Sequence, residues 1–380
     1  LALIAMGTAP RRFPPAATTS QLSWLDALFT ATSAVCVTGL IVVDTPADLT
    51  LFGQLVVLVL IQVGGLGYMA ITTVVAVALG KQLTLQERLT LQEALNVQRM
   101  ERLDRFAMTV FKLTVVIELA AAAVLAARWI PELGFWRGAY YGLFHSVSAF
   151  NNAGFALFSD NLIGYRGDWL INAVITALII VGGLGFVVLN ELRHYRRARR
   201  LSMHSRLVLT VTAILIVGGT LALYLLEIRN PRTLAQLPAG EGALAAYFQA
   251  VSTRTAGFNT LDIGAMTPAG LFVVLVLMFI GASPGGTGGG VKTTTFAITV
   301  AALWATVRGA EEPSIFRRRL TPTLVARAFF ISLIAFLALN AVAAILLATE
   351  RRDLLPILFE TTSAFGTVGA SIVQEFVDEV

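Results

Sequence analysis

Ser148-Ala-Phe-Asn-Asn-Ala-Gly-Phe155 returns in altered form three more times along this chain, and the recurrence decides the fold. The related stretches are Thr32-Ser-Ala-Val-Cys-Val-Thr-Gly-Leu40, Ser252-Thr-Arg-Thr-Ala-Gly-Phe-Asn259 and Thr362-Ser-Ala-Phe-Gly-Thr-Val-Gly369. Each contains one aligned glycine, and these lie roughly 110 residues apart: Gly39, Gly154, Gly257 and Gly369. A repeat of this period indicates that one structural unit is used four times.

The residues before each glycine repeat as well. An aromatic residue stands ten positions earlier in every unit: Phe29, Phe144, Tyr247 and Phe359. Six positions earlier, serine stands in three units and valine in the other: Ser33, Ser148, Val251 and Ser363. We therefore predict that each unit consists of a span, a short helix, an extended turn around the glycine, and a second span.

The composition places these units in a lipid bilayer. Of 380 residues, 56% are hydrophobic and only 13% are charged, and mean hydropathy is +0.77. Soluble globular proteins have roughly 25% charged residues, which makes a soluble enzyme, a disordered chain or a nucleic-acid-binding protein a poor interpretation. The single cysteine excludes an intrachain disulfide framework, and three scattered histidines are too few for a convincing metal cluster.

Apolar segments of two lengths support the unit structure. A transmembrane helix needs about 20 mostly apolar residues, and the candidate spans are 51–79, 106–127, 169–190, 207–226, 269–280, 291–307 and 324–348. Shorter apolar stretches are predicted to be re-entrant or buried helices: Trp24–Ala34, Tyr140–Phe150, Leu244–Val251 and Leu355–Ala364. The predicted fold is an all-α polytopic membrane protein, with four membrane–pore-helix–membrane repeats around one central pore, like a potassium channel.

The repeats are bounded at residues 1–80, 81–190, 191–308 and 309–380. Three connecting segments, 81–105, 191–206 and 308–327, are rich in Lys and Arg, which is typical of cytoplasmic loops. We place them inside and the turns toward the outside, and we expect no nucleic-acid binding from such short, tethered runs. Residues 81–105 are also predicted to form an amphipathic interfacial segment, with docking of a cytoplasmic partner as the alternative.

The four turns share backbone geometry rather than reactive side chains. They read Cys36-Val37-Thr38-Gly39, Asn151-Asn152-Ala153-Gly154, Arg254-Thr255-Ala256-Gly257 and Gly366-Thr367-Val368-Gly369. Four such segments on one axis would present rings of carbonyl oxygens, which replace the water shell of a cation. Glycine permits the twisted backbone, and the C-terminal end of each short helix favours a cation. The expected ligands are the carbonyls of Thr38, Ala153, Ala256, Val368 and their neighbours; ordinary packing turns are the alternative.

The second span of the third unit is interrupted by Gly281-Ala282-Ser283-Pro284-Gly285-Gly286-Thr287-Gly288-Gly289-Gly290. Glycine and proline are the poorest helix formers, so we predict a break between 269–280 and 291–307, with a flexible loop at mid-membrane that can block the pore. Lys292 would repel a cation there or pair with a carboxylate; capping or snorkelling is the alternative.

Other residues are expected to have structural roles. Val63-Gly-Gly-Leu-Gly-Tyr68 nearly recurs as Val181-Gly-Gly-Leu-Gly-Phe186, and small residues permit close helix approach. Arg254 is expected to brace the third turn, with Glu360 as one candidate acid. Glu118 is expected to meet a polar partner at a helix interface.

The four repeated stretches, together with Gly281-Ala-Ser-Pro-Gly-Gly-Thr-Gly-Gly-Gly-Val-Lys-Thr-Thr-Thr295, resemble the Trk/Ktr/HKT superfamily of potassium transporters, most closely its Ktr-type membrane subunit. The resemblance covers essentially the whole chain. It implies a single ion path, potassium uptake through a filter with a glycine in every unit, and an intramembrane gating loop at residues 281–290. The family's first and last spans are mostly absent from these 380 residues, so we expect a longer natural chain.

The resemblance also implies partners and location. Ktr-type subunits form homodimers on an octameric cytoplasmic ring of nucleotide-binding regulatory subunits of the KtrA type, which would bind ATP or ADP. Uptake is commonly stimulated by sodium. The expected location is a bacterial cell membrane, and no cofactor is expected within the chain itself.

Two other function classes were weighed against a potassium pore. A secondary transporter of another small cation or a polar solute also explains a broken helix at mid-membrane, but it predicts inverted repeats, whereas these repeats run parallel. A membrane enzyme needs a nucleophile or an acid–base pair. The one hint of that chemistry is His145 beside Ser146, and adjacent residues on a helix do not face each other. We therefore expect a transporter and not an enzyme.

Overall fold

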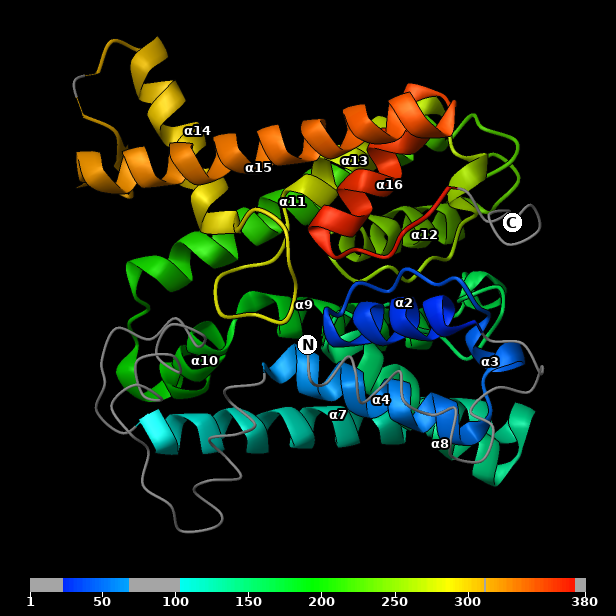
Figure 1. The fold of residues 1–380 in the computed structure, drawn as a ribbon. Helices are drawn as coiled ribbons and strands as arrows, with labels where there is room; N and C mark the ends of the chain where they lie inside the picture. Colours follow the sequence, from blue (N-terminus) through cyan, green and yellow to red (C-terminus); the bar gives the residue numbers. More distant parts are fainter. Residues whose placement is uncertain (1–22, 68–102, 311, 373–380) are drawn as a thin grey trace.

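The structure is a computed structural model that describes residues 23–67, 103–310 and 312–372. Within these ranges the regular structure is almost wholly helical, as Figure 1 shows, and the predicted all-α class is confirmed. The predicted interfacial segment 81–105 lies almost entirely outside the described residues, and so does the end of the span predicted for 51–79.

Four short helices form where the short apolar stretches predict them. They are α2 (Trp24–Val35), α8 (Phe135–Phe150), α12 (Ala239–Ser252) and α16 (Leu354–Gly366). Helix α2 begins with a capping box, in which Ser23 and Asp26 each bond the other's backbone amide. The last turns of α8 and α12 are buried throughout. These helices therefore end inside the protein, where each leads into one of the glycine turns.

Three long helices in the described part are apolar enough to cross a bilayer: α7 (Leu103–Leu133), α11 (Met203–Glu227) and α15 (Pro322–Glu350). Helix α15 contacts α14 and α16, and large apolar side chains such as Phe330 and Ile345 are exposed along it. An apolar helix surface of this kind is solvated by lipid.

The second spans are shorter, and those of the second and third units are bent or interrupted. They are α4 (Leu51–Leu66), α9 (Trp169–Leu184) and, in the third unit, α13 (Pro268–Phe279) with α14 (Thr293–Val307). The break predicted between 269–280 and 291–307 is confirmed, because the chain from Ile280 to Lys292 is not helical. A parallel bridge between Ile280 and Val291 closes the base of this loop.

The span predicted for 169–190 is not one straight helix. Helix α9 ends at Leu184, and α10 (Phe186–Ala198) leaves it at an angle of 104°. The hinge is Gly185, whose φ of +92° is left-handed. A Cβ there would lie 2.4 Å from Pro284 O, and Phe186 N–H donates to Gly285 O over 3.0 Å. The loop between α13 and α14, yellow in Figure 1, therefore occupies the place into which a straight α9 would continue.

The matching glycine motifs place the second spans close to the short helices. A Cβ on Gly64 of α4 would lie 2.0 Å from Val35 O, and a Cβ on Gly182 of α9 would lie 1.9 Å from Phe150 O. Both oxygens belong to the last residue of a short helix. The close approach predicted for these glycines is confirmed, and it holds α4 against α2 and α9 against α8.

The remaining elements lie in the connections. They are α3 (Thr45–Asp48), the 3-10 turns η2 (Ile163–Tyr165) and η3 (Ile263–Ala265), and an antiparallel hairpin of β1 (Ser314–Ile315) and β2 (Arg318–Arg319). The larger apolar core joins α2, α4, α7, α8 and α9, and a second joins α11, α12, α13 and α16. Figure 1 shows these groups on opposite sides of the α13–α14 loop.

Candidate functional site

The four glycine turns contact one another in a closed ring. Each glycine faces the carbonyl oxygen of the residue just before the glycine of the next turn. A Cβ built on the glycine would lie 2.5 Å from that oxygen for Gly39 and Ala153, 2.6 Å for Gly154 and Ala256, 2.2 Å for Gly257 and Val368, and 2.4 Å for Gly369 and Thr38. The contacts run from the first turn to the second, third and fourth, and back to the first. No side chain fits in this ring at the glycine positions.

In every turn, residues with positive φ alternate with a residue whose φ is not positive. The glycines have φ between +70° and +82°. Two residues earlier, φ is again positive although the residue is not glycine: Val37, Asn152, Thr255 and Thr367. A β-branched residue with positive φ is unusual and persists where its surroundings impose it. One residue lies between these two positions in each turn, and it carries the carbonyl oxygen of the ring. The φ of this residue is not positive.

A buried serine anchors the far side of the first three turns. Ser33 Oγ donates to Leu40 O over 2.7 Å, Ser148 Oγ donates to Phe155 O over 2.8 Å, and Ser252 Oγ donates to Phe258 O. Each hydroxyl thereby holds the carbonyl of the residue that follows the turn glycine. The same serine's carbonyl accepts from an amide just before that glycine, at 2.8 Å in all three turns.

The third turn is one residue shorter than the others, which corrects the sequence alignment. In the first turn the serine carbonyl accepts from the fifth residue after it, Thr38, whereas Ser252 O accepts from the fourth, Ala256. Ser252, not Val251, is therefore the equivalent serine. The aromatic residue shifts by one as well, because Phe248 is fully buried like Phe144 and Phe359. The sequence alignment counted a fixed number of residues back from each glycine. It therefore missed the one-residue deletion inside the third turn.

The second turn is tied to the transmembrane helices by an amide. Asn151 Nδ2 donates to Glu118 Oε1 over 3.1 Å and to Gln62 Oε1 over 3.0 Å. Gln62 Nε2 donates to the other Glu118 oxygen over 3.2 Å. The polar partner expected for Glu118 is thus present, and it is a residue of the turn itself. Sequence reasoning missed Gln62, although a glutamine deep in the apolar run of α4 could have indicated a polar contact.

Arg254 is buried, with 7% of its surface exposed. The four salt bridges of the described residues do not include it, and its Nε has no hydrogen-bond partner among them. Glu360, the candidate acid, instead accepts from Ser371 Oγ over 2.8 Å and from Ile372 N over 3.0 Å. The Glu360 carboxylate therefore supports the chain after the fourth turn, and the suggested pair with Arg254 does not form.

His145 supports the chain after the second turn. Leu157 N–H donates to His145 Nε2 over 3.2 Å, so the ring proton is on Nδ1, which lies 2.8 Å from Tyr141 O. Its ring packs against Trp129 and Phe158. Ser146 Oγ donates to Glu118 O, away from His145. The two adjacent residues have separate structural contacts, as their positions on one helix predict.

The loop of residues 281–290 reaches three of the four turns. Thr287 Oγ1 donates to Phe150 O over 3.1 Å and accepts from Asn152 Nδ2 over 2.7 Å. Gly289 N donates to Thr367 Oγ1 over 3.1 Å. A Cβ on Gly288 would lie 2.1 Å from Thr255 Oγ1. These contacts involve the residue two positions before the glycine in the second, third and fourth turns.

Backbone hydrogen bonds fix the same loop to α9. Ser283 N donates to Gly183 O over 2.9 Å, and Thr287 N donates to Gly182 O over 3.1 Å. Lys292 Nζ donates to Gly288 O over 2.6 Å. Of the alternatives weighed for Lys292, pairing with a carboxylate is not seen among the described residues. The ammonium group instead closes the loop on itself.

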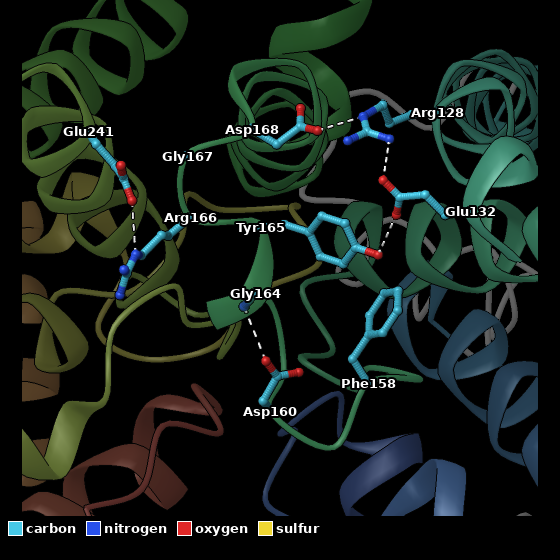
Figure 2. A pocket seen from close by; sticks show the side chains of 10 residues that line it. All are labelled: Arg128, Glu132, Phe158, Asp160, Gly164, Tyr165, Arg166, Gly167, Asp168 and Glu241. Carbon is cyan, nitrogen blue, oxygen red and sulfur yellow. Dashed lines mark hydrogen bonds and ion pairs between the residues drawn. The ribbon is translucent and has the colours of Figure 1, made fainter. Parts of the chain in front are cut away.

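A separate pocket of about 710 Å³ is lined by the end of α7, by residues between the second turn and α9, and by Glu241 of α12. Figure 2 shows its charged lining, in which Arg128 pairs with Glu132 at 2.6 Å and with Asp168 at 2.7 Å, and Arg166 pairs with Glu241 at 2.8 Å. The last pair joins the second unit to the third. Burial raises the pKa of Tyr165 to about 12, and its hydroxyl donates to Glu132. Sequence reasoning did not locate this pocket, because its residues come from separate connections.

The comparisons with known proteins agree with this architecture. A family model described as TrkH, cation transport protein, matches residues 1–375. The chain belongs to the TrkH family of cation transport proteins. The resemblance stated from the sequence is thereby confirmed. This TrkH-family chain is a transporter rather than an enzyme, as expected.

Curated TrkH-family relatives cover most of the chain. Ktr system potassium uptake protein B of Bacillus subtilis is 44% identical over 94% of this chain and 80% of its own length. The protein of the same name from Vibrio alginolyticus is 41% identical over 93% and 78%. The potassium/sodium uptake protein NtpJ of Enterococcus hirae is 37% identical over 92% and 78%.

A solved structure has the same fold. The potassium transporter TrkH from Vibrio parahaemolyticus superposes with a TM-score of 0.78 over 99% of this chain and 76% of its own, at 18% identity. The pore-helix repeat fold expected from the sequence is therefore confirmed for this TrkH-family chain.

Proposed function

We propose that this chain carries potassium into the cell along the axis of its four glycine turns. The observation that carries the proposal is the closed ring of glycine–carbonyl contacts from Gly39 round to Gly369. A ring of carbonyl oxygens replaces the water shell of a cation, as in potassium-selective filters. Potassium is proposed as the cation because two relatives are named as potassium uptake proteins.

The filter is assigned to the sixteen residues of the four turns, with the carbonyls of Thr38, Ala153, Ala256 and Val368 among the ligands. Left-handed backbone at alternate positions supports this assignment. Because the glycines leave no room for a Cβ, a side chain at any of them would displace the neighbouring turn. Selectivity would then depend on the packing of the turns and not on a charged side chain in the ring.

Substitution of Gly257 by Ser tests the filter. Its Cβ would lie 2.2 Å from Val368 O, and its φ of +71° disfavours a side chain. We expect potassium uptake in a transport-deficient cell to fall and the preference for potassium over sodium to shrink. Gly218→Ala in α11 is the control, because a Cβ there meets nothing within 4 Å. Unchanged uptake and selectivity in G257S would refute the filter.

The loop of residues 281–290 is proposed to be the gate. Its contacts with Asn152 and Thr367 support a barrier directly beside the turns. Lys292, bonded to Gly288 O, would help to keep it closed. Deletion of part of the loop should raise potassium flux at rest in proteoliposomes. A lower or equal flux in a correctly folded deletion variant would show that the loop is no barrier.

Further properties are proposed from the relatives and the charge pattern. Sodium stimulation is proposed because a relative is named for the uptake of both ions, the potassium/sodium uptake protein NtpJ. The basic segments 191–206 and 308–327 suit an octameric cytoplasmic ring of nucleotide-binding subunits, and a homodimer in a bacterial cell membrane is proposed with them. Co-purification with such a subunit, and dependence of uptake on ATP or ADP, would test the partner.

A further inference from the structure

A second pocket, of about 240 Å³, lies where two of the basic connections meet. Its lining comes from two segments more than a hundred residues apart: Arg200, Leu201, Met203 and Arg206 where α10 leads into α11, and Phe316 and Arg318 in the β1–β2 hairpin. Both segments belong to the basic connections assigned to the cytoplasmic side. The pocket combines three guanidinium groups with three apolar side chains.

The hairpin has an unusual turn at this pocket. Its two central residues, Phe316 and Arg317, have φ of +50° and +63°, and neither is glycine or asparagine. Two-residue hairpins with left-handed central residues normally use Asn-Gly or similar pairs. Strained backbone persists where the surrounding structure imposes it, and it is common at ligand-binding positions. Here the turn brings Phe316 and Arg318 to the same pocket as the start of α11.

An apolar cluster fixes the hairpin to the ends of the membrane helices. Leu320, just after β2, is buried with Ile298 of α14 and Ala328 of α15. Met203 and Ile315 pack against this cluster, so the start of α11 and strand β1 meet there. The pocket is therefore a built junction of four elements and not a chance approach of two loops.

Among the residues that the structure describes, the arginines of the pocket have no internal counter-ion. None of Arg200, Arg206 and Arg318 forms a salt bridge within the described part of the chain, and all three are exposed. The acids alongside are engaged, since Glu312 pairs with Arg319 at 2.7 Å and Glu191 accepts from Ser202 N over 3.0 Å. The positive end of the α11 dipole adds to the same field. Within the described part of the chain, the charge of the three pocket arginines is thus not balanced by an ion pair.

The pocket is expected to lie at the level of the lipid headgroups. Helix α11 is mostly apolar from Leu207 onward, and α14, which contacts β1, exposes Leu303, Trp304 and Val307 in its last turns. Arg308 stacks over the Trp304 ring at 4.6 Å. Trp beside Arg at the end of an apolar helix is typical of the membrane interface. A lipid whose chains cover these helices would therefore bring its headgroup to the pocket.

We propose that this pocket binds the phosphate of an anionic phospholipid headgroup. The guanidinium groups of Arg200, Arg206 and Arg318 would donate to the phosphate oxygens, because their planar forks suit that geometry. Phe316, Met203 and Leu201 would cover the apolar carbon beside it. Basic pockets between transmembrane helices on the cytoplasmic side bind anionic headgroups in this way. The volume suits one headgroup rather than a protein face. The proposal does not depend on which ion is transported.

Lipid binding by the purified full chain tests the proposal. Native mass spectrometry would titrate phosphatidylglycerol, with phosphatidylcholine as the neutral lipid, against wild type and the triple variant Arg200→Gln, Arg206→Gln and Arg318→Gln. We expect the variant to lose the tightest phosphatidylglycerol site, with its dissociation constant raised about tenfold or more. Retention of that site would overturn the proposal. The single variant Arg318→Gln, which leaves α11 untouched, gives the same test if the triple variant folds poorly.

Two controls separate the pocket from general surface charge and from free phosphate. The triple variant Arg193→Gln, Arg317→Gln and Arg327→Gln removes the same charge from the same connections outside the pocket lining. An equal loss in this control would mean that surface charge alone attracts the lipid. Inorganic phosphate and glycerol 3-phosphate should displace the lipid only at far higher concentrations. Displacement at equal concentrations would identify a soluble phosphate site and refute a lipid site.

Discussion

Asn152 Nδ2 lies 2.7 Å from Thr287 Oγ1, so a side chain of the second turn holds the loop between α13 and α14 in place. The same hydroxyl donates to Phe150 O, the last carbonyl of α8. One threonine thus joins the proposed gate both to the turn and to the helix before it. Loss of this hydroxyl should weaken the closed loop without changing the four carbonyls of the ring.

Thr287→Val should therefore raise potassium flux at rest. The variant keeps the shape of the side chain but removes two hydrogen bonds, each worth about 1 kcal/mol, so about a thirtyfold gain is expected. Flux into proteoliposomes without regulatory partners measures it. Thr287→Ser retains the hydroxyl and should behave like wild type. Equal resting flux in all three proteins would contradict a latch at Thr287.

Glu118→Ala should disturb the second turn from outside the ring. Both Glu118 oxygens accept amide hydrogen bonds, from Asn151 and from Gln62, and removal of the carboxylate leaves these buried donors without it. We expect lower thermal stability and a smaller preference for potassium over sodium, with about 2 kcal/mol lost from the free energy of unfolding. Glu118→Gln keeps one acceptor oxygen and should have a milder effect.

Competition between potassium and sodium in an uptake assay separates the two effects of Glu118→Ala. Glu350→Gln, at the exposed end of α15, is the charge control and should match wild type. A Glu118→Ala protein with reduced stability but unaltered ion preference would show that Glu118 supports the helices and not the turn.

Two adjacent glycines of α9 should differ sharply in tolerance. A Cβ on Gly182 would lie 1.9 Å from Phe150 O, whereas on Gly183 its nearest neighbours would be 3.7 and 3.8 Å away. Gly182→Ala should therefore force α9 from α8 and reduce the yield of folded protein in size-exclusion chromatography. Gly183→Ala should fold normally. Similar yields of the two variants would argue against tight packing of α9 on the end of α8.

Glu227 should matter for stability at the C-terminal end of α11. Its buried carboxylate accepts from Thr267 N and Oγ1, from Asn230 Nδ2 and from Thr233 Oγ1. Glu227→Leu would leave these donors unpaired, and a loss of about 3 kcal/mol or more in the free energy of unfolding is expected. Thermal unfolding of the protein in detergent measures the change. Glu227→Gln should lose less, and no shift in Glu227→Leu would contradict the role of the carboxylate.

The sequence was sufficient for the short helices and the break at 281–290. Length and hydropathy separate a segment such as Tyr140–Phe150 from a span, and six glycines with a proline in ten residues cannot sustain a helix. The close approach at Gly64 and Gly182 also followed from composition, because only residues without a bulky side chain permit it. These features are local, so the sequence carries them directly.

The hinge at Gly185 and the short third turn could not be predicted in the same way. Residues 169–190 are apolar on both sides of Gly185, and at this bend the chain meets Pro284 and Gly285 of another unit. The one-residue deletion before Gly257 became visible only through the hydrogen bonds of Ser252. Both features depend on contacts across long sequence separations, which hydropathy and fixed spacing do not report.

The turns of the ring differ in length and side chains, although they share one backbone pattern. Because a single polypeptide supplies all four, each is encoded once, and a mutation alters one quarter of the ring. A pore of four identical subunits would change at every quarter together. This chain therefore permits a dosage series, with the same glycine replaced in one, two, three or four turns. The dependence of potassium uptake on the number of replaced glycines would show whether the four turns contribute to ion binding independently or together.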